Sequence, residues 1–443
     1  MVESPLKAHS TSVVEPIMEE NQTQSKVYHH YAHTDSCRFS RWTARECHQY
    51  MYARPWQRVN DFYSDLVNGR SSLSDLFSAE NKPSQLHCMD DGESPRTFGE
   101  YEMAPSISKD QSGRWKRVTF KIVISYHGES FDGWQKQPCL NTVQGLVERS
   151  IGSFLDDKKA QQLKDKGLPV EGIAVVAGRT DKGVTALNQV CSFYTWRKDV
   201  EARDIKNSIN IAAVGKLRVV SISQVSRAFH PNFCAKWRRY LYIFPFNDGE
   251  DDEQNNLSEK GEVNLFLNNC QYEQRHEING HFAEENAENS VNNNRELEGQ
   301  KKPTSFSITK VDKLLRQLEG KLLSYKVFAR DTKASRSVGP PSECFLYHAR
   351  AIEAELPCSA KDHKHATKIV CVELVANRFL RKMVRVLVAT AIREAAAGAE
   401  EDMLLELMDA ACRRATAPPA PPNGLCLVDV GYADFDRKKC FIC

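Results

Sequence analysis

The sequence predicts an α+β fold in which two lobes, with mostly antiparallel sheets, enclose a central cleft. Strand-like and helix-like patterns alternate in both halves of the 443-residue chain. Several strand-like runs follow one another too closely for a crossover helix, which favours antiparallel pairing. An acidic, Asn-rich stretch separates the two halves. These three observations set the expected fold class.

In the first half, residues 120–126 alternate apolar side chains with a period of two, as a strand does, and residues 142–155 place theirs at helical spacing. The other elements expected here are strands at 173–177, 189–195, 217–225 and 238–246 and a helix at 204–213.

The second half opens with a helix at 309–323, whose apolar residues share one face. The elements expected after it are strands at 343–355 and 368–376, helices at 378–397 and around 403–413, a Pro-rich loop at 417–422 and a final strand at 425–432.

The same patterns divide the chain into five parts. Residues 1–113 form an accessory region, in which the aromatic segment 38–76 is either a helical pair packed on the core or a partly ordered extension, and 82–113 is a linker. The other parts are a first catalytic lobe at 114–247, a disordered surface insertion at 248–303, a second catalytic lobe at 304–436 and a basic tail at 437–443.

Charge is distributed unevenly over these parts. The insertion carries fourteen acidic and five basic side chains, whereas the whole chain has a net charge of +2. Residues 114–247 and 304–443 together carry 44 basic and 28 acidic side chains. An excess of this size indicates a polyanionic partner, although a merely soluble basic surface is the alternative.

The heptapeptide GRTDKGV at 178–184 places one carboxylate between two glycines, at the end of an apolar run. In extended backbone, Arg179 and Asp181 would share one face, so the guanidinium could orient the carboxylate and keep it ionised. Such a carboxylate suits nucleophilic or general-base chemistry. Asp-Lys-Gly is also a common turn sequence, so the run alone leaves a structural role open.

Four further segments accompany this run. They are SYHG at 125–128 leading to FDGWQKQ at 131–137 and TVQ at 142–144, FHPNFCA at 229–235 leading to RRYLY at 238–242, ANRFLRKMVR at 376–385, and APP at 417–419 leading to Gly424 and Leu425. In this order, and with GRTDKGV between the first two, they resemble the tRNA pseudouridine synthase A family. The resemblance covers residues 116–247 and 304–432.

The resemblance implies the pseudouridine synthase fold, with a basic RNA-binding cleft, and the isomerisation of uridine in structured tRNA, in or near the anticodon arm. No cofactor and no metal are implied, because the reaction needs no redox change or energy input. Asp181 would be the essential carboxylate, with Arg179 paired to it. The substrate-binding residues would be Tyr240, which stacks on the target base, with Thr180, Lys182, Lys236, Arg238, Arg239 and Arg385.

Some features leave alternatives open. Thr185 stands where bacterial members commonly have histidine, so the form is closer to the eukaryotic branch. Tyr240 could instead pack in the core, and the helix face with Arg381 and Arg385 could simply be solvated. The alternative functions are a catalytically inactive RNA-binding protein or RNA chaperone with the same fold, and a scaffold that acts through the insertion and the N-terminal region. The family allows a homodimer, and a monomer is equally compatible.

The last residues, Cys440-Phe441-Ile442-Cys443, follow basic residues and formally make a prenylation box. Phe441 and the final cysteine depart from the preferred box, so membrane anchoring through Cys440 is not expected. A metal-binding role for Cys440 and Cys443 lacks a second ligand pair nearby. The fourteen cysteines show no paired spacing, which favours reduced thiols and the cytoplasm or nucleus, with organelle import left open.

Overall fold

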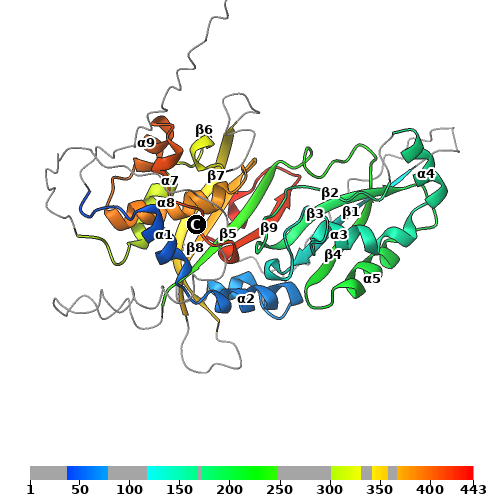
Figure 1. The fold of residues 1–443 in the computed structure, drawn as a ribbon, viewed down its shortest axis with the longest axis horizontal. Helices are drawn as coiled ribbons and strands as arrows, with labels where there is room; N and C mark the ends of the chain where they lie inside the picture. Colours follow the sequence, from blue (N-terminus) through cyan, green and yellow to red (C-terminus); the bar gives the residue numbers. More distant parts are fainter. Residues whose placement is uncertain are drawn as a thin grey trace, which may run out of the picture.

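The computed structural model describes residues 37–77, 117–167, 171–247, 301–330, 342–357 and 367–442. The linker expected at 82–113 and nearly all of the insertion expected at 248–303 lie outside the described residues. Figure 1 shows the described elements as one elongated α+β body.

Within the described residues, nine strands form a single sheet in the order β4-β1-β3-β9-β5-β8-β7-β6, and β2 pairs with β3. The strands are β1 (Val118–Tyr126), β2 (Val175–Val176), β3 (Thr185–Thr195), β4 (Leu217–Val225), β5 (Trp237–Pro245), β6 (Leu322–Ser324), β7 (Glu343–Leu356), β8 (Thr367–Ala376) and β9 (Leu425–Gly431). Every pair is antiparallel except β3 with β9, which confirms the mostly antiparallel α+β class.

The two halves of the sheet meet at the parallel pair β3–β9, which is short: Thr185 lies opposite Cys426 and Ala186 opposite Leu427. Strand β5 comes from the first half of the sequence but lies between β9 and β8 of the second half. The two halves therefore share one continuous sheet (Figure 1). The loop 178–184 leads directly into β3, so the fold places this motif at the seam.

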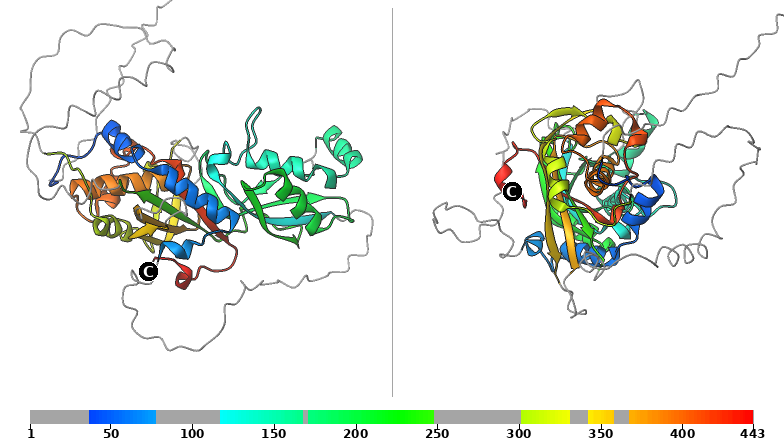
Figure 2. Two further views of the ribbon diagram at one scale, coloured as in Figure 1. Left: turned by 90° about the horizontal axis from the view of Figure 1, so that it is seen from below. Right: turned by 90° about the vertical axis from the view of Figure 1, so that its left-hand side faces the viewer.

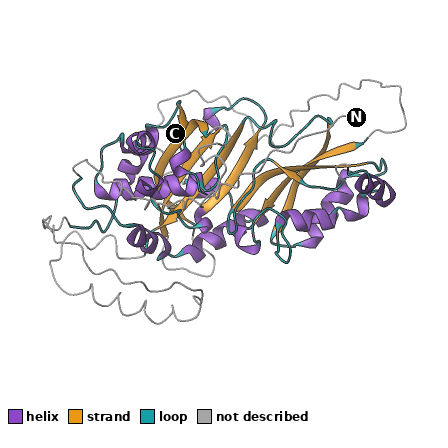
Figure 3. Ribbon diagram, turned by 45° about the horizontal axis from the view of Figure 1, so that its top comes forward, coloured by secondary structure: helices purple, strands orange, loops and turns teal. Residues whose placement is uncertain are grey.

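One face of the sheet carries most of the helices and the larger core (Figure 3). The helices that contribute to this core are α1 (Ala44–Tyr52), α3 (Val143–Ser150), α5 (Ala202–Ala212), α7 (Ile308–Arg316), α8 (Met383–Ala397) and α9 (Met403–Asp409). All fifteen residues of α8 are buried, because α1, α7 and α9 cover the sides that the sheet leaves open. These contacts fix the position of helix α8 relative to the sheet.

The opposite face of the sheet has a second core. Helix α2 (Trp56–Asn68), the short helix η1 (Leu73–Leu76) and the C-terminal segment cover it. In the right-hand view of Figure 2, the C-terminal segment lies on the other side of the sheet from α8 and α9. Of the two alternatives for 38–76, the structure has the helical pair, α1 and α2, and Met51, Val59 and Tyr63 are among its fully buried residues.

The structure differs from the sequence-based expectations at α4 (Asp157–Asp165), β6 and the start of α8. Helix α4 was not predicted, since its sequence has almost no apolar face. Residues 322–324 form strand β6 rather than a helix end. Helix α8 begins at Met383 rather than 378, because Lys382 has a left-handed backbone (φ 60°), which a helix interior does not allow.

The remaining short 3₁₀ helices are η3 (Gly128–Ser130), η4 (Gly152–Phe154), η5 (Lys326–Phe328), η7 (Arg413–Ala415), η8 (Pro422–Gly424) and η9 (Arg437–Lys439). Among the helices in the described ranges, none is both long and apolar enough to cross a membrane.

Candidate active site

Buried polar side chains fasten the loop 178–184 to the sheet. The Gln189 amide donates to the Gly178 carbonyl at 2.8 Å, and the Tyr126 hydroxyl lies 2.7 Å from the Thr180 hydroxyl. The Trp134 amide donates to the Thr180 carbonyl at 3.1 Å. Thr180 is buried, and its hydroxyl and carbonyl are hydrogen-bonded within the chain, so it shapes the loop, and its expected substrate contact stays a prediction.

Two glycines explain why the motif segments lie against one another. A Cβ atom on Gly128 would lie 2.4 Å from the Val184 carbonyl carbon, so only glycine permits this backbone contact. Gly183 has φ +82°, a conformation that favours glycine, and a Cβ there would meet the Pro422 ring at 3.0 Å. The first motif, the aspartate motif and the Pro-rich segment are thus packed together.

The Asp181 carboxylate is half-buried, with 29% of its side chain exposed. Arg385 Nη1 lies 3.4 Å from Asp181 Oδ2, and Arg381 Nε lies 4.0 Å from Oδ1. Arg385 is itself fixed, because its Nε donates to the Ala420 carbonyl at 2.6 Å and only 9% of its side chain is exposed. The helix α8 therefore supplies the cation that orients Asp181.

This pairing corrects the expectation for Arg179. The Arg179 side chain is exposed and makes no hydrogen bond or ion pair with the described residues. The period-two argument fails because β2 ends at Val176, so Arg179 and Asp181 lie in a loop rather than in extended backbone. Arg385, expected as a phosphate contact, occupies the place assigned to Arg179.

Tyr240 projects from β5 toward the same site. Its ring is buried and packs edge-on against Phe379, with centroids 5.1 Å apart. Burial raises the pKa of Tyr240 to about 12; the nearby Arg238 charge opposes this rise and the Asp181 carboxylate adds to it. The Tyr240 hydroxyl makes no hydrogen bond within the described part of the chain, so this donor is available next to Asp181.

Arg238 connects the motif segments. Its guanidinium donates to the carbonyls of Ala177 at 3.0 Å and Asn377 at 2.7 Å, and to Asn232 Oδ1 at 2.6 Å. These hydrogen bonds engage the guanidinium donors within the protein. Burial lowers the pKa of Arg238. Arg238 therefore positions three loops, and its expected contact with a phosphate stays a prediction.

Arg239 lies on the opposite face of the sheet, as strand alternation requires. It is buried, donates to the Lys439 carbonyl at 2.7 Å and has Nε 3.6 Å from Glu373 Oε1. It is therefore not part of this site. The exposed lysines expected as substrate contacts form surface ion pairs, Lys182 with Asp132 at 2.9 Å and Lys236 with Asp434 at 2.7 Å.

One exposed aromatic residue was not among the site residues expected from the sequence. Phe233 is 80% exposed, on the loop that Arg238 holds through Asn232. His230 shapes this loop: its Nδ1 accepts the amides of Asn232 and Phe233 at 3.2 Å, and its ring stacks on Phe233 with centroids 4.2 Å apart. The sequence feature that could have indicated Phe233 is its place in the motif 229–235, as a phenylalanine in a loop next to polar residues.

The mostly antiparallel sheet, with an arginine-bound aspartate at its seam and a buried tyrosine beside it, defines the class as the pseudouridine synthase fold. The family model described as tRNA pseudouridine synthase matches residues 330–433, which include Arg381 and Arg385. The chain is similar to proteins of the tRNA pseudouridine synthase A family.

Its relatives match over different lengths. The tRNA pseudouridine synthase A of Thermotoga sp. (strain RQ2) is 25% identical over 312 residues, which are 70% of this chain and 97% of that protein. That of Thermosipho africanus is 24% identical over 313 residues, 70% of this chain and 98% of the relative. That of Leptospira biflexa is 33% identical over 123 residues, so this alignment spans 28% of the chain and less than half, 42%, of the relative.

Proposed function

We propose that this protein isomerises uridine in tRNA to pseudouridine, with Asp181 as the essential carboxylate. The observation that carries the proposal is the geometry of Asp181, a half-exposed carboxylate 3.4 Å from the fixed guanidinium of Arg385. The relatives named tRNA pseudouridine synthase A supply the reaction class and the substrate class.

The chemistry suits an ionised, oriented carboxylate. The bond from C1′ to N1 breaks, the base turns, and a bond from C1′ to C5 forms, while C5 loses a proton and N1 gains one. Asp181 either attacks C1′ or removes a sugar proton to give a glycal. Both routes begin from the charged carboxylate, which Arg385 and Arg381 stabilise.

The neighbouring groups provide the rest of a nucleotide site. The uridine must leave its stack to reach Asp181, and the Tyr240 hydroxyl is placed to assist the proton transfers. Exposed cations beside the carboxylate, Arg179, Lys182 and Arg381, would bind the flanking phosphates. In line with the family resemblance, we place the target uridine in or near the anticodon arm and the enzyme in the cytoplasm or nucleus.

The test compares wild type, Asp181→Asn and a matched control, Asp132→Asn, which removes a similarly half-buried carboxylate that is paired with Lys182. The substrate is transcribed tRNA carrying tritium at uridine C5, because product formation releases that tritium. We expect Asp181→Asn to release no tritium. It should still bind tRNA with an affinity within about threefold of wild type, because the removed group acts on the reaction. Asp132→Asn should react at a rate within about fivefold of wild type. Equal product from Asp181→Asn and wild type would refute the role of Asp181. Wild-type protein that binds tRNA but converts no uridine would instead support the inactive RNA-binding alternative.

A further inference from the structure

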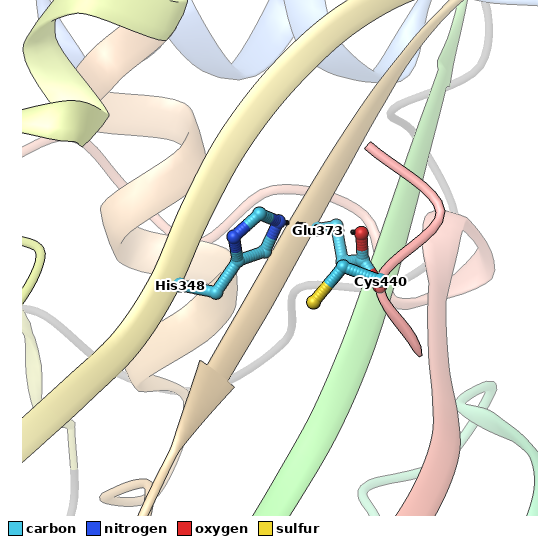
Figure 4. Close-up of side chains that lie close together, drawn as sticks. All are labelled: His348, Glu373 and Cys440. Carbon is cyan, nitrogen blue, oxygen red and sulfur yellow. Dashed lines mark ion pairs between the residues drawn. The ribbon is translucent and has the colours of Figure 1, made fainter. Parts of the chain in front are cut away.

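A second cluster of chemically active side chains lies on the sheet face opposite to Asp181. His348 from β7, Glu373 from β8 and Cys440 from the C-terminal segment converge there (Figure 4). One ligand atom from each lies within 4.8 Å of the others. His348 and Glu373 are completely buried, and Cys440 is half-buried. The active-site chemistry uses none of these residues.

Three buried polar atoms of the cluster, on His348 and Glu373, lack hydrogen bonds within the described ranges. Neither His348 ring nitrogen has a hydrogen-bond partner, and nor does Glu373 Oε1. The imidazole Nε2 lies 3.4 Å from Glu373 Oε2, and Nδ1 lies 3.4 Å from Glu319 Oε1. Leaving buried polar atoms without a partner destabilises the folded protein. Their arrangement fits a partner that accepts electron pairs from these atoms rather than one that forms hydrogen bonds with them.

We propose that His348, Glu373 and Cys440 bind a zinc ion. One imidazole nitrogen, one carboxylate oxygen and one thiolate sulfur form a ligand set that Zn²⁺ accepts, with a water at the fourth position. At usual bond lengths, tetrahedral nitrogen and oxygen ligands are about 3.3 Å apart, close to the observed 3.4 Å. A neutral imidazole, a carboxylate and a thiolate also balance the 2+ charge.

The groups around the cluster already hold these ligands in place. Glu319 beside Nδ1 would keep the proton there and turn Nε2 toward the ion, the usual outer support of a zinc-binding histidine. Glu319 is itself paired with Arg350 and, at 3.0 Å, with Arg437. Glu373 Oε2 accepts the amides that follow Cys440, those of Phe441 and Ile442, each at 2.9 Å.

Bound zinc would lock the C-terminal segment to the sheet. Ile442 is buried, and Phe441 stacks on Phe77 of the N-terminal region with centroids 5.8 Å apart. The ion would therefore also stabilise the contact between the C-terminal segment and the N-terminal region. A prenylated Cys440 has no thiolate to offer, so zinc binding and membrane anchoring through this residue exclude each other.

The experiment uses the full chain purified from zinc-supplemented medium without chelators. Elemental analysis should find about one zinc per chain, as expected for a single four-coordinate site. Cys440→Ser should weaken zinc binding at least about tenfold. The control Cys412→Ser, which alters another half-buried cysteine outside the cluster, should bind as wild type does. Cobalt added to metal-free protein should give a thiolate-to-cobalt absorption band that Cys440→Ser lacks.

Two results would overturn the proposal. One is wild-type protein without zinc after this preparation. The other is unchanged zinc content and cobalt absorption in Cys440→Ser. Circular dichroism of each variant confirms that it is folded, and the tRNA assay is not needed for either readout.

Discussion

Replacing Arg385 is the sharpest test of how this site holds its carboxylate. At 3.4 Å and an effective dielectric constant of about 20, the attraction between the two charges is about 5 kcal/mol. Asp181 is partly exposed, so solvent screening reduces this value, and a charge-assisted hydrogen bond contributes about 1.5–3 kcal/mol. We take about 2 kcal/mol, which corresponds to a rate roughly 30-fold lower.

The assay is single-turnover tritium release at saturating enzyme, which separates the chemical step from tRNA binding. Arg385→Ala and Arg385→Lys should both lose about 30-fold in rate, because lysine cannot hold the Ala420 carbonyl and Asp181 together. Arg179→Ala should instead weaken tRNA binding and keep the rate at saturation, since Arg179 does not touch Asp181. Urea unfolding midpoints control for stability.

The reasoning would be refuted if folded Arg385→Lys reacted within threefold of wild type. It would also fail if Arg179→Ala reproduced the rate loss of Arg385→Ala with tRNA affinity unchanged. The second result would restore the pairing expected from the sequence.

Three other predictions follow from the geometry. Tyr240→Phe should lower the single-turnover rate by about a hundredfold and leave the tRNA Kd within twofold, since the ring stays and the hydroxyl goes; an unchanged rate would exclude the hydroxyl from proton transfer. Phe233→Ala should raise the tRNA Kd by about fivefold or more if a base stacks on it, whereas Ile211→Ala, an equally exposed apolar control on α5, should not; equal effects would count against stacking. Burial raises the pKa of Cys47 and of Cys344 to about 11 in the folded protein. Their stabilisation is thus complete below about pH 9 and is lost as the pH rises through 11, on the order of 2 kcal/mol per thiol. Under reducing conditions the urea midpoint should fall between pH 8.5 and 10.5, and less steeply in Cys47→Ala; a flat profile in wild type would contradict this.

Local patterns predicted most elements of the fold. The strand expected at 217–225 has the same bounds as β4, and helix α5 begins and ends within two residues of the expected positions. Apolar periodicity carries this information, because burial on one face demands it. Helix α4 was not predicted, because all its residues are exposed to some degree and its sequence therefore has no periodic apolar pattern.

The candidate site was predictable only in part. The heptapeptide marked Asp181, but its arginine came from α8, 204 positions away along the chain. Arg238 and Arg239 were treated alike, although strand alternation separates them onto opposite faces, and that signal was present in the sequence. Only the tertiary structure shows that the Arg238 guanidinium donates hydrogen bonds to backbone carbonyls.

The sequence by itself determined the fold class, the position of the candidate carboxylate and the family resemblance, because these depend on residue order and short-range spacing. Tertiary structure alone decided that β5 and β9 join both halves into one sheet and that Arg385 meets Asp181. It also brought Cys440 to His348 and Glu373. Such contacts form between segments remote in sequence, where burial and charge pairing select partners that no local period encodes.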